Sequence, residues 1–176
     1  MTQREIAALF AQMADLLEFR GENLFRIRAY RRAAQNLESL TEDLQRLNQQ
    51  DRLTDIPGIG QDLAGKIREY LTSGVIREIE RVKRTIPAGV LALLEIPGVG
   101  PKTAKLLHER LRITSIDQVE AAAKAHKLCK LPGFQETKEQ NLLKGIAIVR
   151  KGQARMPLGI ALPLARHISH ILKALA

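Results

Sequence analysis

A short motif that occurs twice constrains the fold of this chain more than any other feature of its 176 residues. IPGIGQDLAGKI spans residues 56–67, and IPGVGPKTAKLL follows 40 positions later, at residues 96–107. In both copies an aliphatic residue, Pro, Gly, a second aliphatic residue and Gly precede a helical segment that carries Ala at the same offset. Gly reaches backbone angles that are closed to other residues, and its missing side chain lets a ligand approach the backbone. The pattern predicts two helices joined by a tight turn, present twice.

A third, weaker copy is LPGFQETKEQNL at residues 131–142, which has Gln135 where the last Gly should be. We expect it to keep the turn and to lose some access for a ligand. A single PGxG before a helix could equally be an ordinary Gly-rich turn. Repetition in register favours a repeated structural unit.

Helical periodicity continues through the rest of the chain, and no alternating strand pattern competes with it. The predicted fold class is all-α, with tandem helical hairpins and with Pro87 at a subdomain boundary. The predicted helices cover residues 2–20, 24–40, 44–50, 61–72, 75–85, 88–94, 101–111, 115–126, 137–150 and 160–175.

The chain is strongly basic, with 28 Lys and Arg against 19 Asp and Glu, a net charge of +9. Residues 1–86 carry a net +1 and residues 87–176 a net +8. This balance favours a polyanionic partner, and the second half should dominate the attraction. A solvated basic face without a partner remains the alternative. Aromatic residues make up only 3% and Trp is absent, so we expect no broad platform for stacking unpaired bases.

The single cysteine, Cys129, leads us to exclude an internal disulfide and any Cys-based zinc or iron-sulfur site. We expect it to be a small buried apolar residue and not a nucleophile. The pair His167 and His170 is interpreted as a helix surface and not as a metal site. No signal peptide or membrane-spanning stretch is present, so we expect a soluble, cytoplasmic protein without a membrane partner.

The repeated turns point to phosphate binding. The N–H groups of the turn and of the helix start converge beside the positive end of the helix dipole, which suits an anion such as one phosphate of a DNA strand. No residue there reads a base edge, so binding should be independent of sequence. The second hairpin should bind more strongly, because the first has Gln61 and Asp62 at its helix start. The predicted contacts are Gly58, Ile59 and Gly60 in the first hairpin and Gly98, Val99, Gly100, Lys102, Thr103 and Lys105 in the second.

These hairpins match the helix-hairpin-helix motif, and with FRIRAYRRAA at residues 25–34 the chain resembles the N-terminal part of family X DNA polymerases, which act in DNA repair. Residues 1–86 resemble the small lyase-type domain, residues 88–150 the DNA-binding fingers subdomain, and residues 151–176 the lead-in to the palm. The catalytic palm is missing, so we expect no polymerase activity from this chain. The resemblance implies a monomer near the nucleoid that binds gapped, nicked or duplex DNA as part of base excision repair.

In some family members a lysine removes a 5′-deoxyribose phosphate by Schiff-base chemistry. The matching position is Lys66, six residues after Gly60. The resemblance also assigns Arg26 and Tyr30 to the phosphate pocket. The neighbouring basic positions of the family are Phe25, Asp62 and Glu78 here, which weakens that pocket. A surface lysine with its stem along an apolar groove is the alternative interpretation of Lys66.

The resemblance further implies a monovalent cation, Na⁺ or K⁺, at each hairpin, held by backbone carbonyls. By position these belong to Thr54, Ile56 and Ile59 in the first hairpin and to Leu94, Ile96 and Val99 in the second. Mg²⁺ is expected only for a full-length polymerase.

Three functions therefore stay open: a sequence-independent DNA-binding module of a repair polymerase, a 5′-deoxyribose-phosphate or abasic-site lyase using Lys66, and a helical protein-interaction domain. The first is favoured by the repeated hairpins and by the net +8 of the second half.

Overall fold

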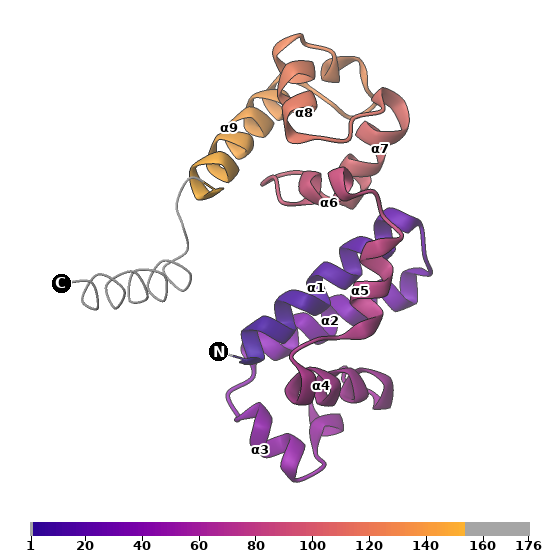
Figure 1. The fold of residues 1–176 in the computed structure, drawn as a ribbon, viewed down its shortest axis with the longest axis vertical. Coiled ribbons are helices and arrows are strands. Elements are labelled where there is room, and N and C mark those ends of the chain that lie inside the picture. Colours follow the sequence, from indigo (N-terminus) through magenta and orange to yellow (C-terminus); the bar gives the residue numbers. More distant parts are fainter. Residues whose placement is uncertain (1, 154–176) are drawn as a thin grey trace, which may run out of the picture. The chain divides into compact units, whose positions relative to one another are not determined.

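The computed structural model describes residues 2–153, and every regular element in that range is a helix (Figure 1). The predicted all-α class is confirmed, and each predicted helix before residue 153 is present with ends shifted by a few residues. Two short 3-10 helices, η1 and η2, precede the first and third turns and were not predicted. The helix predicted over 160–175 lies outside the described residues. The elements are α1 (Thr2–Arg20), α2 (Leu24–Ser39), α3 (Leu44–Gln49), η1 (Leu53–Asp55), α4 (Gln61–Ser73), α5 (Arg77–Arg84), α6 (Ala88–Leu94), α7 (Pro101–Leu111), α8 (Ile116–Lys124), η2 (Leu128–Lys130) and α9 (Glu136–Gln153).

The chain divides into two compact units. The first comprises Met1–Leu94 and Val99–Ser115, and the second comprises Glu95–Gly98 and Ile116–Ala176. Helices α6 and α7 therefore group with the N-terminal helices, although the sequence suggested a boundary at Pro87. The domain limits 1–86, 88–150 and 151–176 remain predictions.

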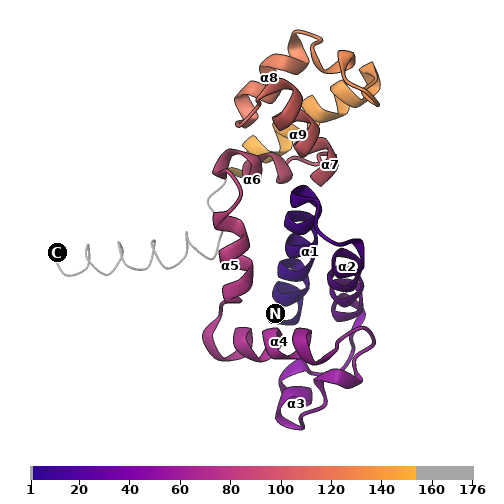
Figure 2. The ribbon, with the colours of Figure 1, turned by 90° about the vertical axis from the view of Figure 1, so that its right-hand side faces the viewer.

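The first unit is built on α1 and α2, which lie side by side and run in opposite directions (Figures 1 and 2). Phe10 of α1 and Tyr30 of α2 meet edge to face, with ring centroids 5.5 Å apart and an interplanar angle of 85°. Phe10 is fully buried, and burying such a side chain contributes about 1.5–3 kcal/mol to folding. Figure 2 shows α4 running across one end of α1 and α5, and α4 contacts α1, so the first hairpin is held against the base of this unit.

The second unit packs α8 and η2 against α9. Its buried apolar side chains come from all three elements and from the turn between them: Val119, Ala123, Leu128, Phe134, Leu142 and Ile146. The third hairpin thus has a core of its own. Among residues 2–153, no helix is both long and apolar enough to span a membrane.

Candidate functional site

The first and second hairpin turns have nearly the same backbone. Gly58 has φ +78° and Gly98 has φ +89°, in the region that favours glycine. Two residues later, Gly60 precedes α4 with φ −87° and ψ −179°, and Gly100 precedes α7 with φ −83° and ψ 174°. The predicted repeat is therefore also a repeat in structure.

The last glycine of each turn is not required by its backbone angles, because other residues also adopt extended conformations with negative φ. Nor does packing require it. A Cβ atom added at Gly60 or Gly100 would meet no atom beyond its chain neighbours within 4 Å in the part of the chain that the structure describes. A side chain at either position would enter open space at the start of α4 or α7. The first N–H groups of a helix have no partner within it and favour an anion.

The two helix starts differ in charge. At the start of α4, the Asp62 side chain is 81% exposed and pairs with Lys66. At the start of α7, the Lys102 side chain is 88% exposed, with Nζ 3.9 Å from a Glu18 carboxylate oxygen. Thr103 and Lys105, also in the N-terminal part of α7, are partly exposed. The second helix start is therefore the more favourable for an anion.

The third hairpin keeps the turn but not the open space. Gly133 has φ +74°, as Gly58 and Gly98 have, and Phe134 is buried like the aliphatic residues at this position in the other copies. Gln135 then places a side chain at the helix start, where the other two copies have glycine. This arrangement agrees with the expectation that the third turn is preserved and its access reduced.

The structure adds Arg32 and Asn36 of α2 to the first hairpin, and neither was predicted as a site residue. A Cβ atom at Gly58 would lie 3.3 Å from Arg32 Cγ and from Asn36 Nδ2. Asn36 also donates a hydrogen bond to the Pro57 carbonyl. The stem of Arg32 thus lies beside a turn whose own helix starts with Asp62. The i, i+4 spacing of Arg28 and Arg32 on α2 was the available sequence signal.

The predicted catalytic residue and its predicted partners lie together at the junction of α2, α4 and α5. Lys66 Nζ is 3.1 Å from Glu78 Oε2, and it also pairs with Asp62. Arg26 forms an ion pair with the same Glu78, and the Tyr30 hydroxyl lies 3.3 Å from Glu78 Oε2. Only 10% of the Lys66 side chain is exposed, so its interpretation as a surface lysine is wrong.

This cluster favours the protonated amine. Burial acts to lower the pKa of Lys66, but its hydrogen bonds to Asp62 and Glu78 and the nearby Tyr30 and Glu78 charges raise that pKa above its ordinary value. For Glu78, burial opposes ionisation, and contacts with Lys66, Arg26 and Tyr30 nevertheless lower the pKa. Burial raises the pKa of Tyr30 to about 12. In this arrangement Lys66 is an ammonium at neutral pH and not a free nucleophile.

The residues predicted to hold a monovalent cation surround the turns. The Ile56 carbonyl accepts a hydrogen bond from the Ile59 N–H at 3.0 Å. A carbonyl oxygen has two lone pairs, so this bond is compatible with a second role as a cation ligand. Thr54 lies within η1, and Leu94 is the last residue of α6. The cation sites remain predictions.

The expectation that Cys129 is a buried apolar residue is wrong, while its expected lack of a nucleophilic role stays a prediction. Its side chain is partly exposed, and the thiol donates to a carboxylate oxygen of Glu139 at 3.0 Å. His126 Nδ1 lies 3.0 Å from the same oxygen. Sequence reasoning missed this group because Glu139 reaches Cys129 and His126 only when α9 folds back onto η2.

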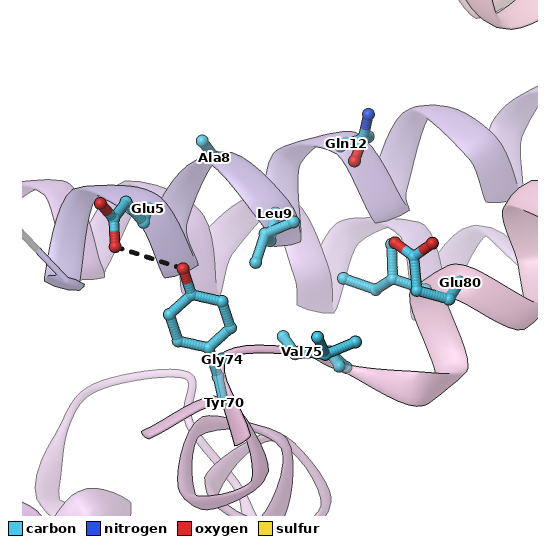
Figure 3. Close-up of a pocket in the computed structure, with 10 residues that line it drawn as sticks. Glu5, Ala8, Leu9, Gln12, Tyr70, Gly74, Val75 and Glu80 are labelled. Carbon is cyan, nitrogen blue, oxygen red and sulfur yellow. Dashed lines mark hydrogen bonds between the residues drawn. The ribbon is translucent and has the colours of Figure 1, made fainter. Parts of the chain in front are cut away.

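The first unit also contains an apolar hollow of about 570 Å³ between α1, the end of α4 and α5. Figure 3 shows Leu9 and Val75 at this hollow, with the Tyr70 hydroxyl donating to Glu5 at 3.2 Å. None of the predicted site residues lines it.

Comparison with known families agrees with the geometry of the turns. A family described as "Helix-hairpin-helix domain" matches residues 1–76, and one described as "SAM-like Helix-hairpin-helix tandem" matches residues 90–147. The chain is therefore a tandem helix-hairpin-helix protein.

Two relatives identify the family. Over 180 residues, the chain is 30% identical to the "DNA polymerase/3'-5' exonuclease PolX" of Bacillus subtilis, with 98% of the chain and 31% of that protein aligned. It is also 29% identical over 108 residues to "DNA polymerase lambda" of Arabidopsis thaliana, with 61% of the chain and 20% of that protein aligned. The chain belongs with the N-terminal regions of family X DNA polymerases, and it spans less than a third of either relative.

Proposed function

We propose that this chain binds DNA through the sugar-phosphate backbone, without sequence preference, as the N-terminal part of a family X repair polymerase. The DNA structures that it binds are gapped or nicked duplexes and duplex ends. It acts as a monomer in the cytoplasm, at the nucleoid. Both relatives are named as DNA polymerases, which supports DNA as the partner.

The observation that carries this proposal is the open space at Gly60 and Gly100. Neither backbone angles nor packing within the described residues call for glycine at these positions. Glycine is required, however, if a phosphate approaches the first N–H groups of α4 or α7, because a Cβ atom would stand between the backbone and the ligand. Two such turns on one chain can hold two phosphates.

Charge supports the same assignment and indicates that the second hairpin contributes more to DNA binding than the first. Lys102 and Lys105 lie at the start of α7, and the second half of the chain carries a net +8. The first hairpin relies on Arg32 against the charge of Asp62. Contacts of this kind neutralise phosphates and release counterions, and they carry no information about base sequence.

Fluorescence anisotropy with labelled duplexes at several salt concentrations tests the proposal. We expect affinity to fall steeply and log-linearly with salt, and to vary little among duplexes of unrelated sequence. Binding that does not respond to salt, or a hundredfold preference for one sequence, would contradict it. Failure to bind any DNA would favour the protein-interaction alternative.

A second candidate, a 5′-deoxyribose-phosphate lyase, is supported by the convergence of Lys66, Arg26 and Tyr30 in one cluster. A buried amine next to an arginine and a tyrosine could receive a sugar aldehyde and its phosphate. Glu78 and Asp62 oppose this chemistry, because they stabilise the protonated amine and repel a phosphate. We therefore expect weak lyase activity at most. Trapping with borohydride on a pre-incised abasic duplex tests it.

A further inference from the structure

The three side chains His126, Cys129 and Glu139 bring together a nitrogen, a sulfur and a carboxylate oxygen at the third hairpin. These atoms all lie within 4.8 Å of one another. His126 Nδ1 and Cys129 Sγ each lie 3.0 Å from Glu139 Oε2. All three residues belong to the second unit, so the group does not depend on how the two units are placed.

The repeat shows how unusual this group is. A constant offset of 75 residues relates the first hairpin to the third, so that Asp51, Thr54 and Ala64 correspond to His126, Cys129 and Glu139. The position of Ala64 is also alanine in the second hairpin, as Ala104, and both alanines are fully buried. The hairpin therefore folds with a methyl group where the third copy has a carboxylate.

Glu139 is 2% exposed, and burying a carboxylate is costly unless it has partners. Its Oε1 accepts hydrogen bonds from the backbone N–H groups of Leu128 at 3.0 Å and of Cys129 at 3.2 Å. Those bonds fix the carboxylate against η2. The second oxygen, Oε2, is then directed at the imidazole and the thiol, which are two of the preferred ligands of zinc.

The geometry points to a binding site for a divalent transition-metal ion of the zinc class, with His126 Nδ1, Cys129 Sγ and Glu139 Oε2 as ligands. Tetrahedral zinc with bonds of about 2.0 Å to nitrogen and oxygen and about 2.3 Å to sulfur separates its ligand atoms by roughly 3.3–3.6 Å. The two separations of 3.0 Å need to open by about half an ångström, and the third pair, His126 Nδ1 and Cys129 Sγ, which lie within 4.8 Å of each other, must settle at about 3.6 Å. This movement is open to His126, whose side chain is 72% exposed.

Three protein ligands leave the fourth position to water, and the exposure of His126 gives the ion a path from solvent. On binding, the Cys129 S–H bond breaks, the proton leaves to solvent and the thiolate bonds to the metal, without any change in oxidation state. The ion then joins the end of α8 and η2 to α9, so we expect it to stabilise the second unit. A hydrogen-bonded cluster without affinity for metal is the alternative that the experiment must exclude.

Cobalt substitution tests the site directly, because Cys129 is the only cysteine of the chain. Metal-free protein is titrated with Co²⁺ under a non-chelating reductant, and Zn²⁺ is then added. We expect one equivalent of Co²⁺ to produce a thiolate-to-cobalt charge-transfer band and strong tetrahedral visible bands, which Zn²⁺ abolishes. Absence of the charge-transfer band would overturn the proposal.

Three variants assign the ligands. Cys129→Ser should abolish the charge-transfer band, and Glu139→Gln, which keeps an acceptor for the two backbone N–H groups, should weaken metal binding by at least about tenfold. The decisive variant is His126→Gly, because His126 has φ +50° and occupies the position after α8 where glycine is preferred. It should weaken metal binding at least about tenfold while the metal-free protein unfolds at the same or a higher temperature. Unchanged affinity in both His126→Gly and Glu139→Gln would mean that the ion binds Cys129 alone, and would refute the site.

Asp51→Gly provides the matched control. Asp51 has φ 55° at the corresponding position of the first hairpin, so glycine there relieves the same left-handed backbone strain without changing any of the three ligands. We expect its affinity for Co²⁺ to equal that of the parent protein, and a loss of affinity here would contradict the assignment. Zn²⁺ should raise the unfolding temperature of the parent and of Asp51→Gly, and leave that of Cys129→Ser unchanged.

Discussion

Lys66 Nζ lies 3.1 Å from Glu78 Oε2, and only a tenth of the Lys66 side chain is exposed. The family resemblance assigns a Schiff-base nucleophile to this lysine, yet the structure surrounds it with two carboxylates. Burial alone would favour the neutral amine, but the two carboxylates and Tyr30 outweigh that effect and raise its pKa. Glu78, which contacts Lys66, Arg26 and Tyr30 and so holds the predicted lyase site together, thus also opposes its chemistry.

The first prediction concerns covalent trapping. On a pre-incised abasic duplex, the parent protein should give little borohydride-trapped adduct at neutral pH. Glu78→Gln should give several-fold more, because it removes a carboxylate that stabilises the ammonium and repels the phosphate. Adding Lys66→Ala to Glu78→Gln should remove the adduct. An adduct that survives Lys66→Ala would exclude this lysine as the nucleophile.

The second prediction concerns stability in acid. The folded-state pKa of Glu78 is lowered, so its stabilising contribution is complete above the unfolded pKa of about 4.5 and is lost as pH falls through the folded value. Glu78→Gln should lower the free energy of unfolding at neutral pH by about 1–3 kcal/mol, and this difference should shrink below about pH 4.5. Chemical denaturation at several pH values measures it. Glu80→Gln, which removes a more exposed ion pair with Lys83, is the control and should change stability by less than about 1 kcal/mol.

The third prediction uses the two tyrosines of the chain. Burial raises the pKa of Tyr30 to about 12. Its phenol should therefore ionise well above the ordinary range, and the native state should lose stability as pH rises from about 10 towards that value. Ultraviolet absorbance of tyrosinate in the Tyr70→Phe variant follows Tyr30 alone. Ionisation of Tyr30 near pH 10 in folded protein would show that its hydroxyl is not buried as described.

The fourth prediction separates the two glycines of the second turn. Gly98→Ala should lower the free energy of unfolding by about 1–2 kcal/mol, because Gly98 has φ +89°. Gly100→Ala should change the free energy of unfolding by at most about 0.5–1 kcal/mol, because the backbone of Gly100 is extended and the space beside it is open. Urea denaturation of both variants decides the matter, and equal losses would contradict the different roles assigned to these residues.

The all-α fold and the three hairpin turns could be predicted from sequence because their signals are local. Glycines that need positive φ, a Pro before them and helical periodicity after them occupy fixed offsets, as in IPGIG and IPGVG. The charge difference between the helix starts at Asp62 and Lys102 was also visible.

Features that depend on contacts between different helices could not be predicted in the same way. Glu78 reaches Lys66 because the chain turns at Gly74 between α4 and α5, and Glu139 reaches Cys129 because α9 folds onto η2. Neither contact produces a periodic pattern in the sequence. The buried Glu139 was nevertheless visible as the residue that breaks the alanine pattern of Ala64 and Ala104. A departure from an internal repeat was therefore the best available sequence signal for the proposed metal site.

The central claim is that DNA phosphates approach the helix starts behind Gly60 and Gly100, and that the second contributes more. Gly60→Val and Gly100→Val test it as a matched pair, since both positions have the same extended backbone, which a β-branched residue adopts readily. Binding of a labelled duplex is measured by fluorescence anisotropy at one salt concentration, with unfolding temperatures measured in parallel. We expect Gly100→Val to raise the Kd about tenfold and Gly60→Val clearly less, with similar unfolding temperatures for both. Equal losses of affinity, or none in either variant, would contradict the claim.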